Sequence, residues 1–291
     1  LIAHAIGPIW EANHVWLIFV VVLLFTCFPP AFAAIVTELH VPLTLMLFGI
    51  VLRGSAFTFR TYDSQADDVQ RRWGLVFSLS SVLTPATLGI CVGAIASGAV
   101  ATAGAVPPAA GFVARFVAPW TAPFIVGGGG FTLALFAFLA AVYLTVEADG
   151  DDALQEDFRR RALAAGVTVF AGAAATLVLA RGDAPLVLTG VTATPAALLL
   201  QLATGVAALA ALVALWRRQF RAARLASAAQ VSLILWGWAL AQAPWIIPPS
   251  LTLHDAAAPG ITLRLTLGAV ALGAVVLVPS LAYLFRLFKA R

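Results

Sequence analysis

The stretch GPIWEANHVWLIFVVVLLFTCFPPAFAAIVTELHV, residues 7–41, decides the fold class of this chain. Residues 12–37 contain no Asp, Glu, Lys or Arg. A helix of these 26 residues is about 39 Å long, and about 20 apolar residues suffice to cross the hydrocarbon core of a bilayer. We therefore expect a membrane-spanning helix. Pro29-Pro30 predicts a kink or a break within it, because proline cannot donate a backbone hydrogen bond.

The composition of the whole chain indicates the same class. Of the 291 residues, 62% are hydrophobic and 10% are charged, and the mean hydropathy is +1.00. A soluble domain does not carry so few charges, so we predict a polytopic protein embedded in the lipid bilayer. Cys27 and Cys91 lie in apolar runs and form no CxxC motif, so the sequence does not indicate a zinc or iron–sulfur site.

Charge-free runs predict an all-α bundle of eight transmembrane helices, which forms one membrane domain over residues 1–291. The predicted spans cover residues 12–37, 42–60, 73–97, 116–146, 162–180, 195–216, 225–247 and 265–285. The segments between them, including EADGDDALQEDFRRR at 147–161, are predicted to be loops. Gly127–Gly130 fall inside the fourth span, where they favour close contact with a neighbouring helix.

Basic residues are distributed unevenly between the two sides that these spans define. Of the 17 Lys and Arg residues, 14 fall on one side, and three, Arg115, Arg181 and Arg264, fall on the other. Cytoplasmic loops carry the excess of Lys and Arg, so the first side, with the C-terminus, is predicted to be cytoplasmic. This distribution also explains the net charge of +4 without a nucleic-acid partner.

Polar and aromatic residues crowd the start of the first span. Glu11 and His14 are three residues apart and share a helix face, with Asn13 beside them. Ionisable residues at membrane depth are costly and mark functional sites. A desolvated carboxyl group has a raised pKa and can exchange protons near neutral pH. Glu11, Asn13 and His14 are therefore a candidate proton path, and a structural ion pair or a charge favoured by the helix dipole is the alternative.

The second predicted span contains two arginines, of which Arg53 is a candidate partner for the same site. Arg53 and Arg60 lie on one helix face, with Arg53 about 10 Å deeper in the membrane. Arg60 can extend its side chain to the membrane surface, whereas the depth of Arg53 requires a partner. We predict that Arg53 pairs with Glu11, because both lie toward the cytoplasmic ends of adjacent helices.

A redox centre held by this chain would need axial ligands, and the sequence offers few. Haem iron commonly takes His or Met ligands, but only His14 and Met46 fall inside the predicted spans. We predict that the chain itself binds no haem, other cofactor or metal ion and carries no catalytic residue.

Three motifs together resemble subunit II of cytochrome bd-type quinol oxidases, including the cyanide-insensitive branch. Residues 7–16, GPIWEANHVW, are similar to the family pattern G-P-x-W-[D/E]-x-N-x-V-W, and a Phe-Pro step follows at residues 28–29. Residues 52–60, LRGSAFTFR, and residues 243–253, APWIIPPSLTL, are similar to two further family segments. Besides the proton-path residues and the two arginines, the residues that carry the resemblance are Gly7, Pro8, Trp10, Trp16, Pro244 and Trp245.

The resemblance implies a heterodimeric oxidase in the inner membrane of a prokaryotic cell, which oxidises quinol and reduces oxygen to water with cytoplasmic protons. Haem b and haem d would lie in the partner, subunit I. The family also leaves room for a structural quinone and a small accessory subunit. Glu11 matches a carboxylate of the proton path that is proposed for the family. Family members have nine helices, so we expect this chain to lack the first.

A polytopic transporter that moves a small solute through its own bundle is the alternative from another class. Transporters often contain internal repeats with paired broken helices. Pro29-Pro30 and Gly127–Gly130 could be such breaks, but the residues around them share no pattern. An optical spectrum separates the two readings: haem bands that travel with a larger chain indicate the oxidase, and a colourless monomer indicates the transporter.

Overall fold

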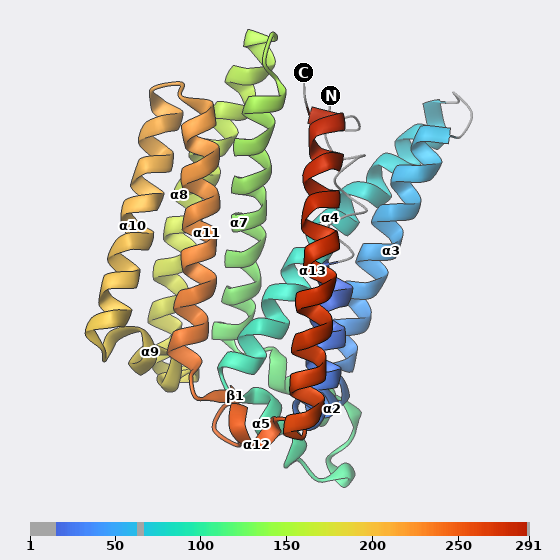
Figure 1. The fold of residues 1–291 in the computed structure, drawn as a ribbon, viewed down its shortest axis with the longest axis vertical. Helices are drawn as coiled ribbons and strands as arrows, with labels where there is room; N and C mark the ends of the chain where they lie inside the picture. The colour runs from blue at the N-terminus through green and yellow to red at the C-terminus, as the bar shows by residue number, and fades with distance from the viewer. Residues whose placement is uncertain (1–15, 63–66, 290–291) are drawn as a thin grey trace. The chain divides into compact units, whose positions relative to one another are not determined.

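The structure, a computed structural model, describes residues 16–62 and 67–289 and is almost entirely helical (Figure 1). Its described residues contain seven helices that are long and apolar enough to cross a membrane, or eight if one bent pair counts as a span. The predicted all-α polytopic membrane fold is confirmed. The chain divides into two compact units, one formed by residues 34–252 and the other by the remainder.

The unit formed by the two ends of the chain contains the predicted break of the first span. The helix Trp16–Cys27 and α2 (Pro29–Glu38) are bent by 119° relative to each other. The prolines at the bend lack N–H groups. A distant segment also contacts the bend, because the Ala258 N–H donates to the Cys27 carbonyl at 2.8 Å. The same unit holds α12 (Leu253–Ala256) and α13 (Gly260–Lys289).

The second unit consists of long helices joined by short segments. The long helices are α3 (His40–Tyr62), α4 (Asp67–Ala96), α7 (Pro123–Glu147), α8 (Asp152–Asp183), α10 (Pro195–Trp216) and α11 (Phe220–Gln242). The shorter elements are α5 (Ala99–Gly104), η1 (Pro108–Ala110), α6 (Phe112–Phe116), η2 (Ala118–Trp120) and α9 (Pro185–Thr192). After α11, the strands β1 (Trp245–Ile247) and β2 (Leu251–Thr252) pair antiparallel, with Trp245 opposite Thr252.

Four helices of this unit, α7, α8, α10 and α11, pack side by side around a small core (Figure 1). Phe138 of α7 is the largest fully buried side chain in that core. Its neighbours on the other three helices are mostly small, and the core includes Ala162, Val169, Ala211, Ala214, Leu215 and Ala223. Small residues let helices approach closely in a membrane, where packing replaces the hydrophobic effect as the source of helix association.

Gly127–Gly130 lie where α7 crosses α4, and the predicted close contact is confirmed. A methyl group added at Gly129 would lie 2.9 Å from the carbonyl oxygen of Ala86. One added at Gly89 of α4 would lie 2.6 Å from the carbonyl oxygen of Gly128. By contrast, no side chain or neighbouring helix lies within 4 Å of a methyl group added at Gly130. The crossing therefore depends on particular glycines of the run.

The predicted loop at 147–161 is wrong over most of its length, because α8 begins at Asp152 rather than at residue 162. The Asp151 carboxylate caps the helix by accepting from the Leu154 N–H at 3.0 Å. Acids then precede bases by four residues, as in the Asp157–Arg161 pair. The 32-residue α8 is about 48 Å long, which is longer than the bilayer core is thick. The charged residues of its first turns can therefore be helical and still lie in water.

Three other predicted boundaries shift for local reasons. The predicted loop at 181–194 contains α9, whose first residue, Pro185, lacks the N–H that a first helical residue leaves unpaired. Pro123 likewise starts α7, so the fourth span begins there rather than at residue 116. The predicted loop at 217–224 is largely the beginning of α11.

Candidate functional site

The predicted proton-path residues Glu11, Asn13 and His14 lie outside the described residues, and so do Gly7, Pro8 and Trp10 of the same motif. Trp16 is the first residue of the motif that the structure describes. Its partly exposed indole meets Phe19 edge-on, with 6.2 Å between the ring centroids. The pairing of Glu11 with Arg53 therefore stays a prediction.

Arg53 lies well inside α3, nine residues before Tyr62, or about 14 Å from the helix end. Its guanidinium carbon lies 5.4 Å from the centroid of the Phe77 ring in α4, a cation–π contact. The Arg53 Nε is buried without a hydrogen-bond partner, and no carboxylate of residues 16–62 or 67–289 lies within ion-pair distance. A buried charge requires an acceptor, which for Arg53 the described part of the chain does not supply. Arg60 lies nearer to the end of α3, and its side chain is outside the description.

The third motif lies beside a pocket of about 190 Å³ between α9, α11 and β1. Pro244 joins α11 to β1, and Trp245, the first residue of β1, lines the pocket with Gln242. The Gln242 amide donates to the Ile246 carbonyl at 3.1 Å, while its buried Oε1 has no hydrogen-bond partner. The lining of this pocket is largely apolar.

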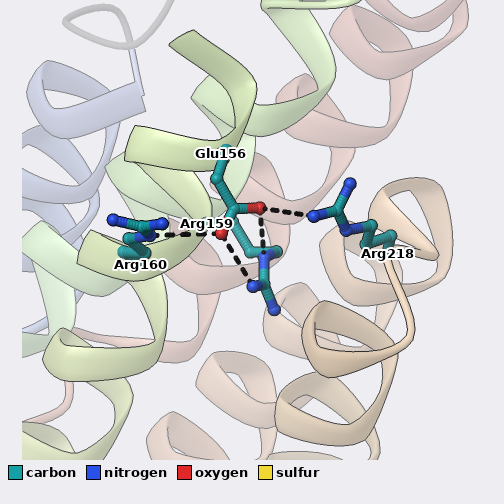
Figure 2. Close-up of polar contacts among 4 residues, drawn as sticks. All are labelled: Glu156, Arg159, Arg160 and Arg218. Atoms are coloured by element: carbon teal, nitrogen blue, oxygen red, sulfur yellow. Dashed lines mark hydrogen bonds and ion pairs between the residues drawn. The ribbon is translucent and has the colours of Figure 1, made fainter. Parts of the chain in front are cut away.

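An ion-pair network ties α8 to the end of α10 at the arginine-rich ends of the helices (Figure 2). Glu156 of α8 accepts from Arg159 through both oxygens at 2.8 Å and from Arg160 at 3.2 Å. Its Oε2 also lies 3.2 Å from Nη2 of Arg218, which follows α10 with a φ of 58°, a left-handed conformation typical of helix ends. The spacing in EDFRRR indicates the first two partners, but only the fold supplies Arg218.

Two further contacts join helices at the same ends. The Arg224 guanidinium lies 3.8 Å from the Glu147 carboxylate and 4.4 Å from the centroid of the Tyr143 ring, linking α11 to α7. The Gln155 amide donates to the Thr145 carbonyl at 2.8 Å, linking α8 to α7. Charged and polar side chains at these ends therefore connect neighbouring helices of the bundle, which is a structural role.

A partly buried ion pair joins α2 to α6, and the sequence pattern does not indicate it. Glu38, the last residue of α2, lies 3.2 Å from Nη2 of Arg115 in α6 through its Oε1. The Oε2 of Glu38 and the Nε of Arg115 are both buried without a hydrogen-bond partner. His40 packs against the same helix, with 4.6 Å between its ring centroid and that of Phe116.

Metal ligands do not gather in the described part of the chain. No group of three or more His, Cys, Asp or Glu residues between 16 and 62 or between 67 and 289 could hold a metal ion. His40 packs against an aromatic ring, and His254 is fully exposed beside Asp255. Because His14 and Glu11 are outside these ranges, the predicted lack of a metal in this chain stays a prediction.

The long apolar helices, with ion pairs concentrated at their ends, define a multi-pass α-helical membrane protein. Residues 1–288 match the family model for cytochrome bd terminal oxidase subunit II, and the chain belongs to this family. The predicted resemblance to subunit II of cytochrome bd-type oxidases is confirmed.

A curated relative gives a shorter match. The chain is 30% identical over 92 residues to the cytochrome bd ubiquinol oxidase subunit 2 of Bacillus subtilis (strain 168). This match covers 31% of the chain and 26% of the relative, so it spans about a quarter of the relative's length.

Proposed function

We propose that this chain is the non-haem subunit of a quinol:oxygen oxidoreductase of the cytochrome bd type. The family match over residues 1–288 carries the proposal. In this proposal the chain forms a heterodimer with subunit I, which holds haem b and haem d. Quinol supplies the electrons, and oxygen is reduced to water during aerobic respiration. A small accessory subunit fits the same assembly.

This chain contributes a scaffold for subunit I and a proton path from the cytoplasm. Reduction of oxygen to water consumes protons, which must reach a buried metal centre through polar groups of the protein. In this proposal Glu11, Asn13 and His14 belong to that path, and Glu11 takes up the protons. The buried, unpartnered Nε of Arg53 supports its pairing with Glu11, because it is a cation in need of an acceptor.

The arginine-rich helix ends around Glu156 face the cytoplasm in this proposal, and the C-terminus lies on the same side. The host membrane is the inner membrane of a prokaryotic cell. If the complex holds a structural quinone in this subunit, the largely apolar pocket beside Trp245 is the candidate position.

Purification in mild detergent tests the proposed assembly. We expect an optical spectrum with haem b and haem d bands that travels with a second, larger chain, and quinol-dependent oxygen consumption. A colourless monomer that binds or transports a small solute would overturn the proposal in favour of a transporter.

Substitution of the first proton-path residue tests the role of this chain. Glu11→Gln in the intact complex should slow oxygen reduction by at least about tenfold with normal haem content, because an amide cannot relay protons. Glu11→Asp is the matched control and should retain most of the activity, since it keeps a carboxyl group. Wild-type turnover in Glu11→Gln would limit the residue to a structural role.

A further inference from the structure

Residues 97–122, which we call the outer segment, connect α4 to α7 through two short α-helices and two 3-10 turns. The residues that the structure gives for the main hydrophobic core come from α7, α8, α10 and α11 and include none of this segment. Its side chains instead reach the turn between α2 and α3. Arg115 binds Glu38, and Phe116 packs against His40.

The carboxylate of Glu38 is enclosed at this joint. Its side chain is only 7% exposed, and a methyl group added at Gly104 of α5 would lie 3.8 Å from Oε1. The Arg115 guanidinium carbon lies 5.1 Å from the centroid of its neighbouring Phe116 ring, which His40 contacts as well. Two helices of the outer segment, α5 and α6, therefore meet at a single acidic side chain.

Arg115 and Glu38 make one of the two hydrogen bonds of a bidentate arginine–carboxylate pair. An arginine can bind both oxygens of a carboxylate through two of its nitrogens. Here Nη2 contacts Oε1 at 3.2 Å, while Nε and Oε2, the atoms of the second bond, are buried without partners. Without Arg115, the Glu38 carboxylate would be an uncompensated buried charge, whereas the Arg115 side chain is 23% exposed. The carboxylate therefore favours the position in which the two groups meet.

We propose that Glu38 and Arg115 form a latch that holds the outer segment closed on the turn between α2 and α3. Loss of either partner opens the segment, while the four-helix core, to which the segment does not contribute, stays folded. The latch is independent of the proposed oxidase function, because it rests on contacts within residues 34–252 alone.

Limited proteolysis of the purified full complex tests the latch. Arg115 is the only Lys or Arg between Arg72 and Arg159, so trypsin can cut the outer segment only after this residue. When cleavage is slow relative to closing, its rate follows the population of the open form. We expect Glu38→Gln to raise the rate of cleavage after Arg115 roughly tenfold, with unchanged haem bands. Asp255→Asn, which alters an exposed acid, is the matched control. Trypsin should cleave this variant after Arg115 at the wild-type rate.

The partner residue gives an independent variant. Arg115→Gln should accelerate chymotrypsin cleavage after Phe112 and Phe116 to a similar degree, and it provides the test if Glu38→Gln does not assemble. Arg115→Lys should give an intermediate rate, because lysine keeps the charge but cannot form two parallel bonds. Wild-type cleavage in the neutral variants, or equal acceleration in the Asp255 control, would overturn the latch.

Discussion

Glu156 faces three arginines, two from its own helix and one from the connection between α10 and α11. We predict that Glu156→Gln lowers the Tm of the complex by a few degrees, because Arg159, Arg160 and Arg218 lose their shared acceptor. Added salt should lower the wild-type Tm more than that of the variant, since salt screens partly exposed pairs. Thermal unfolding at low and high ionic strength measures both effects.

Asp157→Asn is the control for this network. Asp157 pairs only with Arg161 among the contacts that the structure describes, and both side chains are largely exposed at 48% and 69%. Its removal should change the Tm little. Equal Tm losses in the two variants would mean that the shared contacts of Glu156 add nothing beyond an ordinary surface pair.

Residue spacing reveals partners within one helix and fails across helices. Glu156 and Arg160 are four residues apart, so their contact could be predicted from the sequence alone. Arg115 and Glu38 belong to separate elements, and only the fold brings them together. The residues of the proton path came from the resemblance as much as from chemistry, and their geometry stays a prediction.

The crossing of α4 and α7 makes a prediction at the scale of elements. Gly129→Ala should destabilise the protein by about 1–3 kcal/mol, the usual cost of overpacking, because its methyl group would meet the Ala86 carbonyl at 2.9 Å. Gly130→Ala, one residue further along the same helix, has open space and should be neutral or stabilising. Thermal unfolding of the purified complex compares the two. Similar losses of stability in the two variants would show that the packing against α4 does not explain the effect.

Helix existence was predictable from the sequence, whereas helix ends were not. Charge-free runs located the spans because the bilayer excludes charge. The same criterion misplaced the start of α8, where the Asp151 cap and a charged first turn extend the helix beyond the apolar run. Pro29-Pro30 indicated a break in the first span, but proline content does not encode the size of the bend, which is 119°.

For the whole molecule, the charge distribution predicts which helix ends face the cytoplasm. Asp149, between α7 and α8, and His254, after β2, are both exposed. Three candidate spans, α8, α10 and α11, separate them. The eight-residue α9 is about 12 Å long and too short to cross. An odd number of crossings places the two residues on opposite sides of the membrane.

Cysteine labelling tests this arrangement in a background with Cys27→Ala and Cys91→Ala. In intact spheroplasts, a membrane-impermeant maleimide should label His254→Cys, whereas Asp149→Cys should react only after permeabilisation. The reverse pattern would contradict the orientation inferred from the arginines and place the proposed proton path on the outer side. Labelling of both positions from one side would mean that α8, α10 or α11 does not cross. In either case the proposed proton path would have to be reconsidered, because it requires Glu11 and the arginine-rich helix ends to share the cytoplasmic side.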